Sequence, residues 1–187
     1  MAFSKRRSRD ALLVVVAAAR LALAAPGCTG KDPTKPGTSI GVFGVEAKLV
    51  STTGGSVPDP WKFDVRLRHD GATLYWVQGD APIAAPIDAS DHAVLTSSVV
   101  SEMRPANEKT KTAACVMSRA DVVDLVLTSP STDVGAATSF TGSLGYTFAA
   151  TDGSSCEDQL AESGGDFATI PCSVSYELVA TRTGDAR

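Results

Sequence analysis

The chain has 187 residues, 43% of them hydrophobic, and its 17 basic and 21 acidic residues give a net charge of −4. This length suits one domain with its own core. Beyond the first ten residues the basic side chains form no run or stripe, and an acidic surface repels phosphate backbones. Nucleic acid is therefore not an expected partner.

The first 27 residues have the shape of an export signal. Four basic residues within 1–10 precede an apolar run over 11–25, as in a signal peptide. The run is shorter than the roughly 20 residues that a membrane-spanning helix needs, and Arg20 interrupts it. We expect residues 1–27 to be removed on export to an extracytoplasmic compartment.

Ala25-Pro26-Gly27-Cys28 resembles the lipobox of bacterial lipoprotein precursors. The resemblance implies that Cys28 carries a diacylglycerol, becomes the new N-terminus and binds the membrane. Thr29 stands where the family places an inner-membrane retention aspartate, so the resemblance favours the outer membrane. The alternative is ordinary cleavage at the small-x-small sequence 22–24, which leaves a soluble periplasmic or secreted protein.

The charge balance becomes more acidic once residues 1–27 are removed. They hold five basic residues and one acidic residue, which leaves 12 against 20 and a net charge of −8. We interpret this acidity as a solubility device. Residues 28–38, polar and rich in proline and glycine, are predicted to be the lipidated cysteine and a flexible tether. Residues 39–183 are predicted to be a single β domain and 184–187 a tail.

Hydrophobicity alternates with a period of two over most of the predicted domain. Apolar residues at 61, 63, 65 and 67 alternate with charged ones, which predicts a half-buried antiparallel strand. Asp70-Gly71 follows and predicts a hairpin to a strand at 73–78. The same alternation predicts long strands at 139–150 and 170–181.

Weaker patterns predict four more strands, at 40–50, 93–103, 113–118 and 121–128. The fold class is therefore all-β, an antiparallel meander of about eight strands. A lipocalin-like barrel and a two-sheet β-sandwich both fit this spacing, and the choice between them stays open.

Three cysteines follow Cys28, at positions 115, 156 and 172. We predict a disulfide between Cys156 and Cys172 because they flank one connection between neighbouring strands, with a short helix inside it that is capped by Ser155 and begins at Glu157. Cys115 is then a buried reduced thiol. Its pairing with either of the other two stays open, because sequence does not determine connectivity.

The run 140–148, then Cys156 and the segment 170–176, resembles the C-terminal pattern of small β-rich bacterial envelope lipoproteins. The resemblance covers about a third of the chain after Cys28. These proteins bring no known activity or ligand, so the resemblance implies a location and a fold without a function.

Motifs for common enzyme chemistry are missing from the sequence. It contains no HExxH, CxxC, phosphate-binding glycine loop or G-x-S-x-G elbow. His69 and His92 each stand beside an aspartate at a predicted turn, where we expect solvated side chains, so no metal or other cofactor is expected. Trp61, Tyr75 and Trp76 lie on neighbouring predicted strands and are candidates to line a ligand cavity or a sugar-stacking surface, although such aromatic residues also build cores.

Three classes of function follow from these patterns. The leading hypothesis is a lipid-anchored envelope protein with a binding or structural role and no catalysis, whose partner is an envelope protein, a glycan or a small apolar ligand. The second is a lipocalin-like carrier of a small apolar ligand, which requires a dry cavity inside the barrel. The third is a hydrolase whose site is assembled from residues distant in sequence.

Overall fold

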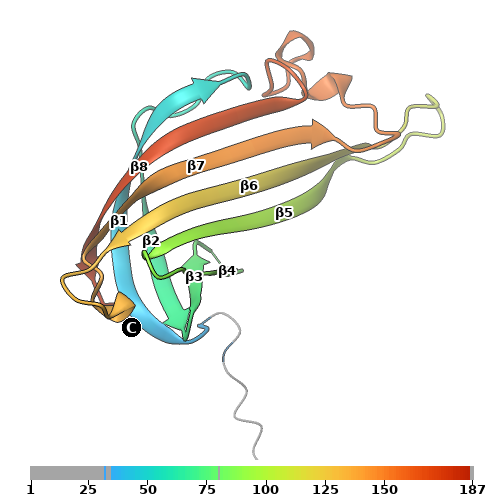
Figure 1. Cartoon of the computed structure of the whole chain (residues 1–187). Coiled ribbons are helices and arrows are strands. Elements are labelled where there is room, and N and C mark those ends of the chain that lie inside the picture. The colour runs from blue at the N-terminus through green and yellow to red at the C-terminus, as the bar shows by residue number, and fades with distance from the viewer. Residues whose placement is uncertain (1–31, 33–34, 80, 186–187) are drawn as a thin grey trace, which may run out of the picture.

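The computed structural model describes residues 32, 35–79 and 81–185. The predicted signal peptide and Cys28 lie outside these residues. Within them the chain forms one eight-stranded antiparallel sheet (Figure 1). The strands are β1 (Thr38–Thr52), β2 (Trp61–Asp70), β3 (Thr73–Val77), β4 (Ile83–Pro86), β5 (His92–Arg104), β6 (Cys115–Thr128), β7 (Ser139–Ala150) and β8 (Cys172–Gly184).

The sheet curls into a nearly closed barrel. Its order is β4-β3-β2-β1-β8-β7-β6-β5, so the chain follows a meander and β8 returns to pair with β1. The circle is incomplete between β4 and β5, where one isolated bridge joins Ile87 to Ala93. We call this opening the seam. The predicted all-β meander is confirmed, and of the two architectures the barrel is the one that forms.

Two details of the predicted strand list are wrong. The segments 113–118 and 121–128 belong to one continuous strand, β6, because the polar residues between them keep their register with β7, as in the pairs Ser118 with Ala149 and Asp121 with Tyr146. Strand β4 was not predicted, since its four residues Ile-Ala-Ala-Pro are too few to show a period.

The hairpin of β2 and β3 forms at its predicted position. Asp70 pairs with Thr73, and Gly71 occupies the first turn position with φ of 58°. This left-handed conformation favours glycine, which has no Cβ to collide with the backbone.

Aromatic rings fill the middle of the barrel. Phe43 and Phe140 are fully buried with ring centroids 5.5 Å apart, and Trp76 is 2% exposed and packs edge-on against Phe140 at 5.9 Å. They come from β1, β7 and β3, so they join strands across the interior. Tilted and edge-on geometries of this kind add to the stabilisation from burial.

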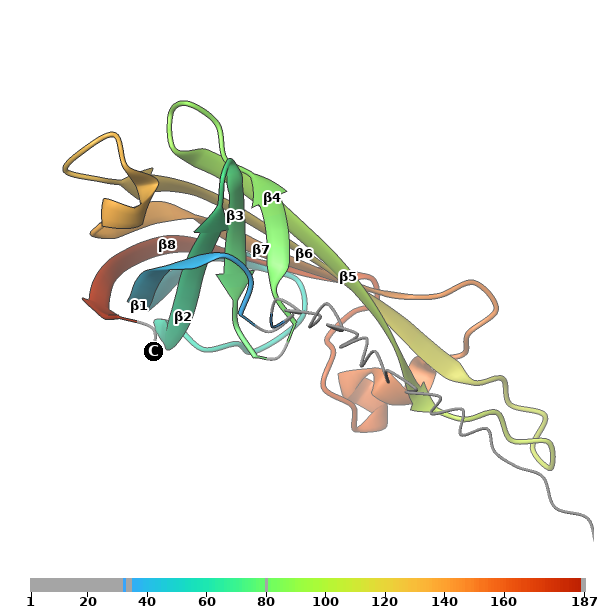
Figure 2. The same ribbon diagram turned by 90° about the horizontal axis from the view of Figure 1, so that it is seen from below.

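The hairpin of β5 and β6 extends beyond the rest of the barrel (Figure 2). We call residues 99–119 the arm. Within the arm a second, smaller core contains Cys115, Met117 and Cys156, and it is covered by three partly buried residues, Phe148, Phe167 and Ile170. The segment that follows β7 therefore folds back over the arm.

The disulfide joins Cys115 to Cys156, so the predicted pairing of Cys156 with Cys172 is wrong. After β7 the backbone runs along the start of β6, where the Thr151 N–H donates to the Val116 carbonyl (2.9 Å) and the Ser155 N–H to the Ala114 carbonyl (3.1 Å). This course brings Cys156 beside Cys115.

Cys172 is the free thiol. It begins β8 opposite Phe148 and lies so close to Gly54 that a Cβ at position 54 would be 3.1 Å from its sulfur. Burial raises the pKa of this thiol, which keeps it protonated and unreactive.

The predicted helix after Cys156 forms as two short 3₁₀ turns, η2 (Glu157–Gln159) and η3 (Ala161–Ser163). The Ser155 hydroxyl donates to the Glu157 carboxylate at 2.6 Å and makes no backbone cap. A third turn, η1 (Val134–Ala136), links β6 to β7. None of the helical turns in the described residues has the length and apolar character required to cross a bilayer.

Candidate functional site

A pocket of about 600 Å³ lies at the seam. Residues 81–84 line it from the β4 side, and residues 96–99 of β5 line it from the other. Its remaining wall comes from Trp76 and Gln78 and from three residues of β6 and β7, namely Arg119, Asp121 and Tyr146. The pocket therefore joins the exterior to the end of the aromatic core.

Asp121 is the buried charged residue among those that the structure describes, with 7% of its surface exposed. Its carboxylate accepts hydrogen bonds from Arg119 Nε (2.8 Å) and Nη2 (2.9 Å) and from the Ser97 hydroxyl (3.2 Å). The two parallel bonds from one guanidinium offset the cost of removing the carboxylate from water. The Arg119 side chain is 46% exposed, so the pair is buried on one side and accessible on the other.

The same arginine covers the ring of Tyr146, with its guanidinium carbon 5.6 Å from the ring centroid. Burial raises the pKa of Tyr146 to about 12, and the negative charge of Asp121 acts in the same direction. The phenol therefore stays neutral at physiological pH and remains able to donate a hydrogen bond. Ser97, Arg119, Asp121 and Tyr146 form one polar cluster in a largely apolar wall.

A smaller apolar hollow of about 150 Å³ continues along the arm. It shares Val99 and Arg119 with the seam pocket, and its other walls include Met103, Met117 and Phe148. Val99 is 47% exposed and Met103 49% exposed. The two hollows together, which we call the seam groove, offer apolar surface on both sides of one polar cluster.

Of the three aromatic residues predicted to line a ligand cavity, Trp76 borders the seam pocket. Trp61 packs into the core against Phe63 (4.4 Å between centroids) and Tyr176 (5.7 Å). Tyr75 is the neighbour of Trp76 in β3 and, with the period of two, points to the opposite face. The three residues therefore do not form one surface.

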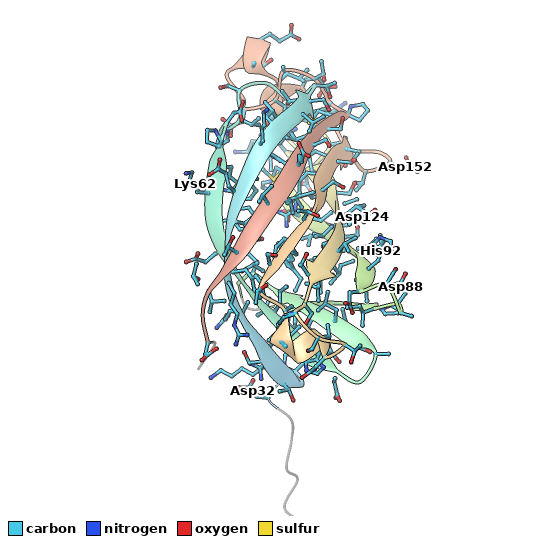
Figure 3. The ribbon with its side chains drawn as sticks, turned by 60° about the vertical axis from the view of Figure 1, so that its left-hand side comes forward. Asp32, Lys62, Asp88, His92, Asp124 and Asp152 are labelled. Atoms are coloured by element: carbon cyan, nitrogen blue, oxygen red, sulfur yellow. A yellow bond between two sulfur atoms is a disulfide. The ribbon has the colours of Figure 1, made fainter. Side chains whose placement is uncertain are left out.

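The two histidines lie in different surroundings. His92 is on β5, with Nε2 2.8 Å from Asp124 Oδ1 and Nδ1 3.6 Å from Asp88 Oδ2, and Figure 3 shows the three side chains together. His69 is on β2, where its Nδ1 is buried without a hydrogen-bond partner in the described structure. Asp88 and Asp124 approach different nitrogens of the His92 ring, and no three His, Cys, Asp or Glu side chains of the described residues are arranged so that they could hold a metal ion.

Hydrogen bonds shift the pKa values of His92 and Asp88. The hydrogen bond with Asp124 raises the pKa of His92. The Ser90 hydroxyl, followed by the backbone N–H of His92, lowers the pKa of Asp88 to about 2. The Ser90 hydroxyl donates to Asp88 at 2.6 Å, so this serine is engaged by the carboxylate.

The polar cluster at the seam was not predicted from the sequence, although a signal for it exists. The inward residues of β6 occupy odd positions, such as Val123 and Leu125. Arg119 and Asp121 also occupy odd positions, so two oppositely charged residues lie on the face of the strand that is otherwise apolar. Dividing β6 into two strands at this point concealed the pattern.

Comparisons of the chain with protein-family models, with curated proteins and with solved structures give no match.

Proposed function

We propose that the chain is a lipid-anchored envelope protein that binds a partner or ligand in the seam groove and catalyses no reaction. The observation that supports this most is Asp121, a buried carboxylate held by Arg119 at the wall of a pocket of about 600 Å³. A charged pair among apolar walls supplies the few convergent polar groups that orient a ligand. The Arg119 side chain, which is 46% exposed, is the part of this pair that a ligand can reach.

The filled interior favours the groove over a cavity inside the barrel. Phe43, Phe140 and Trp76 meet across the centre with centroid distances of 5.5 and 5.9 Å. A lipocalin-like carrier needs this space for its ligand. We therefore place binding at the seam, and the carrier of a small apolar ligand becomes the second candidate, using the apolar hollow along the arm.

The binding site can be tested with the apolar anionic dye anilinonaphthalene sulfonate as a probe. Val99 lines both parts of the groove, whereas Val94 lies on the same strand with a similar exposed fraction (44% against 47%) and on the opposite face. We expect Val99→Glu to weaken dye binding about tenfold, the equivalent of about 1.4 kcal/mol. Val94→Glu adds the same charge and should leave binding unchanged. Equal effects of the two variants on a fluorescence titration would contradict a site in the groove.

The proposed anchor rests on Cys28, which lies outside the described residues. Just before β1 begins, Arg68 donates to the Pro36 and Gly37 carbonyls, each at 2.8 Å, at the end of the segment that we propose as the tether. Lipid attachment contributes about 0.8 kcal/mol per buried CH₂ group, and more than one acyl chain makes release negligible.

Cys28→Ala is accordingly expected to move the protein from the membrane fraction to the soluble fraction. N-terminal sequencing of the wild-type protein should begin at position 28. A mature protein that begins at Ala25, or a variant that stays with membranes, would refute the anchor without affecting the dye experiment.

A hydrolase would need a histidine that activates a nucleophile. Ser90 is engaged by Asp88, and His92 lies between two carboxylates on an exposed surface. We expect the full chain to be inert toward ester, glycoside, phosphate and peptide substrates. Turnover that survives purification and disappears in His69→Ala or His92→Ala would favour the hydrolase.

A further inference from the structure

Strand β5 ends the sheet and has a free edge along most of its length. It pairs with β6 from His92 to Arg104, whereas on its other side Ala93 forms one isolated bridge with Ile87, the residue that follows β4. The described residues provide no other strand beside it. A strand edge of this kind exposes a row of backbone donors and acceptors.

The backbone direction at the start of β5 identifies which residues face the free edge. The Asp91 carbonyl accepts from Leu127 N–H of the β6 strand, while the His92 carbonyl accepts from Asp88 on the other side, both at 2.9 Å. Backbone polar groups alternate sides along a strand. Ser98, Val100 and Glu102 therefore direct their N–H and C=O groups away from β6.

This edge lacks the usual protection against pairing. Between residues 94 and 103 it contains no lysine and no proline, and its one charged residue is Glu102. Val99, Val100 and Met103 are 47%, 62% and 49% exposed. A register shift between Glu102 and Arg104 ends the regular edge. Edge strands of soluble proteins are normally interrupted by lysine, proline or bulges along their length.

We infer that this edge is an interface with a second copy of the chain, formed by antiparallel pairing of β5 with β5 about a two-fold axis at Val100. In this register Val100 meets its own counterpart and Ser98 meets Glu102 of the other copy. No two like charges face each other, and Arg104 stays on Asp158 at 3.1 Å. The same residues contribute from both copies, and Val100 of one copy lies beside Val100 of the other, as a self-complementary interface requires.

The shape and size of the edge fit a weak dimer. Figure 2 shows the β5–β6 hairpin extending away from the barrel. Pairing over 98–102 forms roughly six backbone hydrogen bonds, and an interface of this extent falls below the ~1,200 Å² of stable complexes. Two acidic chains also repel each other at long range. Anchoring on one membrane surface would offset both effects by raising the effective concentration.

Cysteine cross-linking of the full chain tests the pairing. Val100→Cys places a thiol at the two-fold axis, whereas Val50→Cys and Val179→Cys place one on exposed sites that are 65% and 57% accessible. At equal protein concentration under mild oxidation, we expect the first variant to form dimers linked through position 100 at least about tenfold faster. Peptide mapping identifies the linked position. A rate no faster than the two controls would overturn the proposal.

A second variant separates edge pairing from random collision. Ser98→Pro, added to Val100→Cys, removes a free-edge N–H without removing a bond to β6, and it should reduce cross-linking to the control rate. Ser98→Ala keeps the N–H and should leave the rate high. Fast cross-linking that survives Ser98→Pro would also overturn the proposal. Dye binding is measured separately on the reduced, monomeric Val100→Cys variant, because Val100 does not line the seam groove whereas Ser98 and Val99 of the pairing segment do.

Discussion

The barrel and the arm are built from the same strands but are stabilised in different ways. In the barrel, inward residues of β7 such as Phe140 meet rings from opposite strands and are fully buried. Farther along β7, Phe148 packs against the small core of the arm, remains partly exposed and meets Phe167 of a covering segment at 5.5 Å. An inward-facing residue becomes part of a core only where another wall stands opposite it. In the arm a disulfide supplements the small core.

Removing a ring from each region should show this difference most strongly. Phe140→Ala leaves a cavity in the closed barrel, and we expect it to lower the free energy of unfolding by about 3 to 5 kcal/mol. Phe148→Ala removes the same ring from a partly exposed site and should cost about 1 to 2 kcal/mol. Urea unfolding followed by tryptophan fluorescence measures both. Similar losses would mean that the arm is packed as tightly as the barrel.

Replacing both disulfide cysteines by alanine should affect the arm more than the barrel. Cys115 and Cys156 are separated by 41 residues, for which the chain-entropy model gives a stabilisation of up to about 4 kcal/mol. Native-state hydrogen exchange should show faster opening at residues 99–119 and 151–171 than at the centre of β1. Cys172→Ala serves as the control with an intact disulfide. Uniform acceleration over the whole chain would indicate that the arm does not open separately.

The difference between the regions also explains how much the sequence could predict. Strands β2, β7 and β8 alternate cleanly because one face packs on the core and the other meets water, and these strands appear near their predicted positions. Closure into a barrel depends on β1 pairing with β8 at opposite ends of the chain. Nothing in the local pattern of either strand specifies this partner, so barrel and sandwich could not be separated.

The site was harder to predict because it depends on where segments meet. The sequence favoured Cys172 as the partner of Cys156 because the two flank one connection, whereas the course of the backbone after Thr151 brings Cys156 beside Cys115. Tyr146 and Asp121 become neighbours only through the register of β6 with β7. A local signal did exist at Asp121, whose position is in phase with the apolar face of its strand.

The boundary between the regions can be examined at Asp121. Asp121→Asn keeps the shape of the side chain but removes the charge that pairs with Arg119. We expect a loss of about 1 to 3 kcal/mol, reduced by the solvent that reaches the arginine. Asp124→Asn is the matched control on the same strand, since that side chain is 50% exposed. Equal stability of the two variants in urea would show that the buried pair contributes nothing to holding the barrel wall at the seam.

The smallest effect is expected at the bridged end of the seam, where Asp88 and His92 lie. The pKa of His92 is raised in the folded protein, chiefly by Asp124. A raised folded-state pKa contributes stability that is fully present below the unfolded value of about 6.5 and is lost as the pH rises through the folded value. Because the cluster is exposed to solvent, the contribution is small and sensitive to salt.

His92→Gln should therefore be less stable than the wild type at pH 5.5, and the difference should shrink by pH 8.5. NMR titration of the imidazole should give a pKa above 6.5 that falls in Asp124→Asn. The pH dependence of the stability that Asp88 contributes is opposite to that of His92. The pKa of Asp88 is lowered to about 2, so its contribution to stability disappears as the pH falls from about 4 toward 2. An imidazole pKa that does not change in Asp124→Asn would show that the 2.8 Å contact does not stabilise the charged ring.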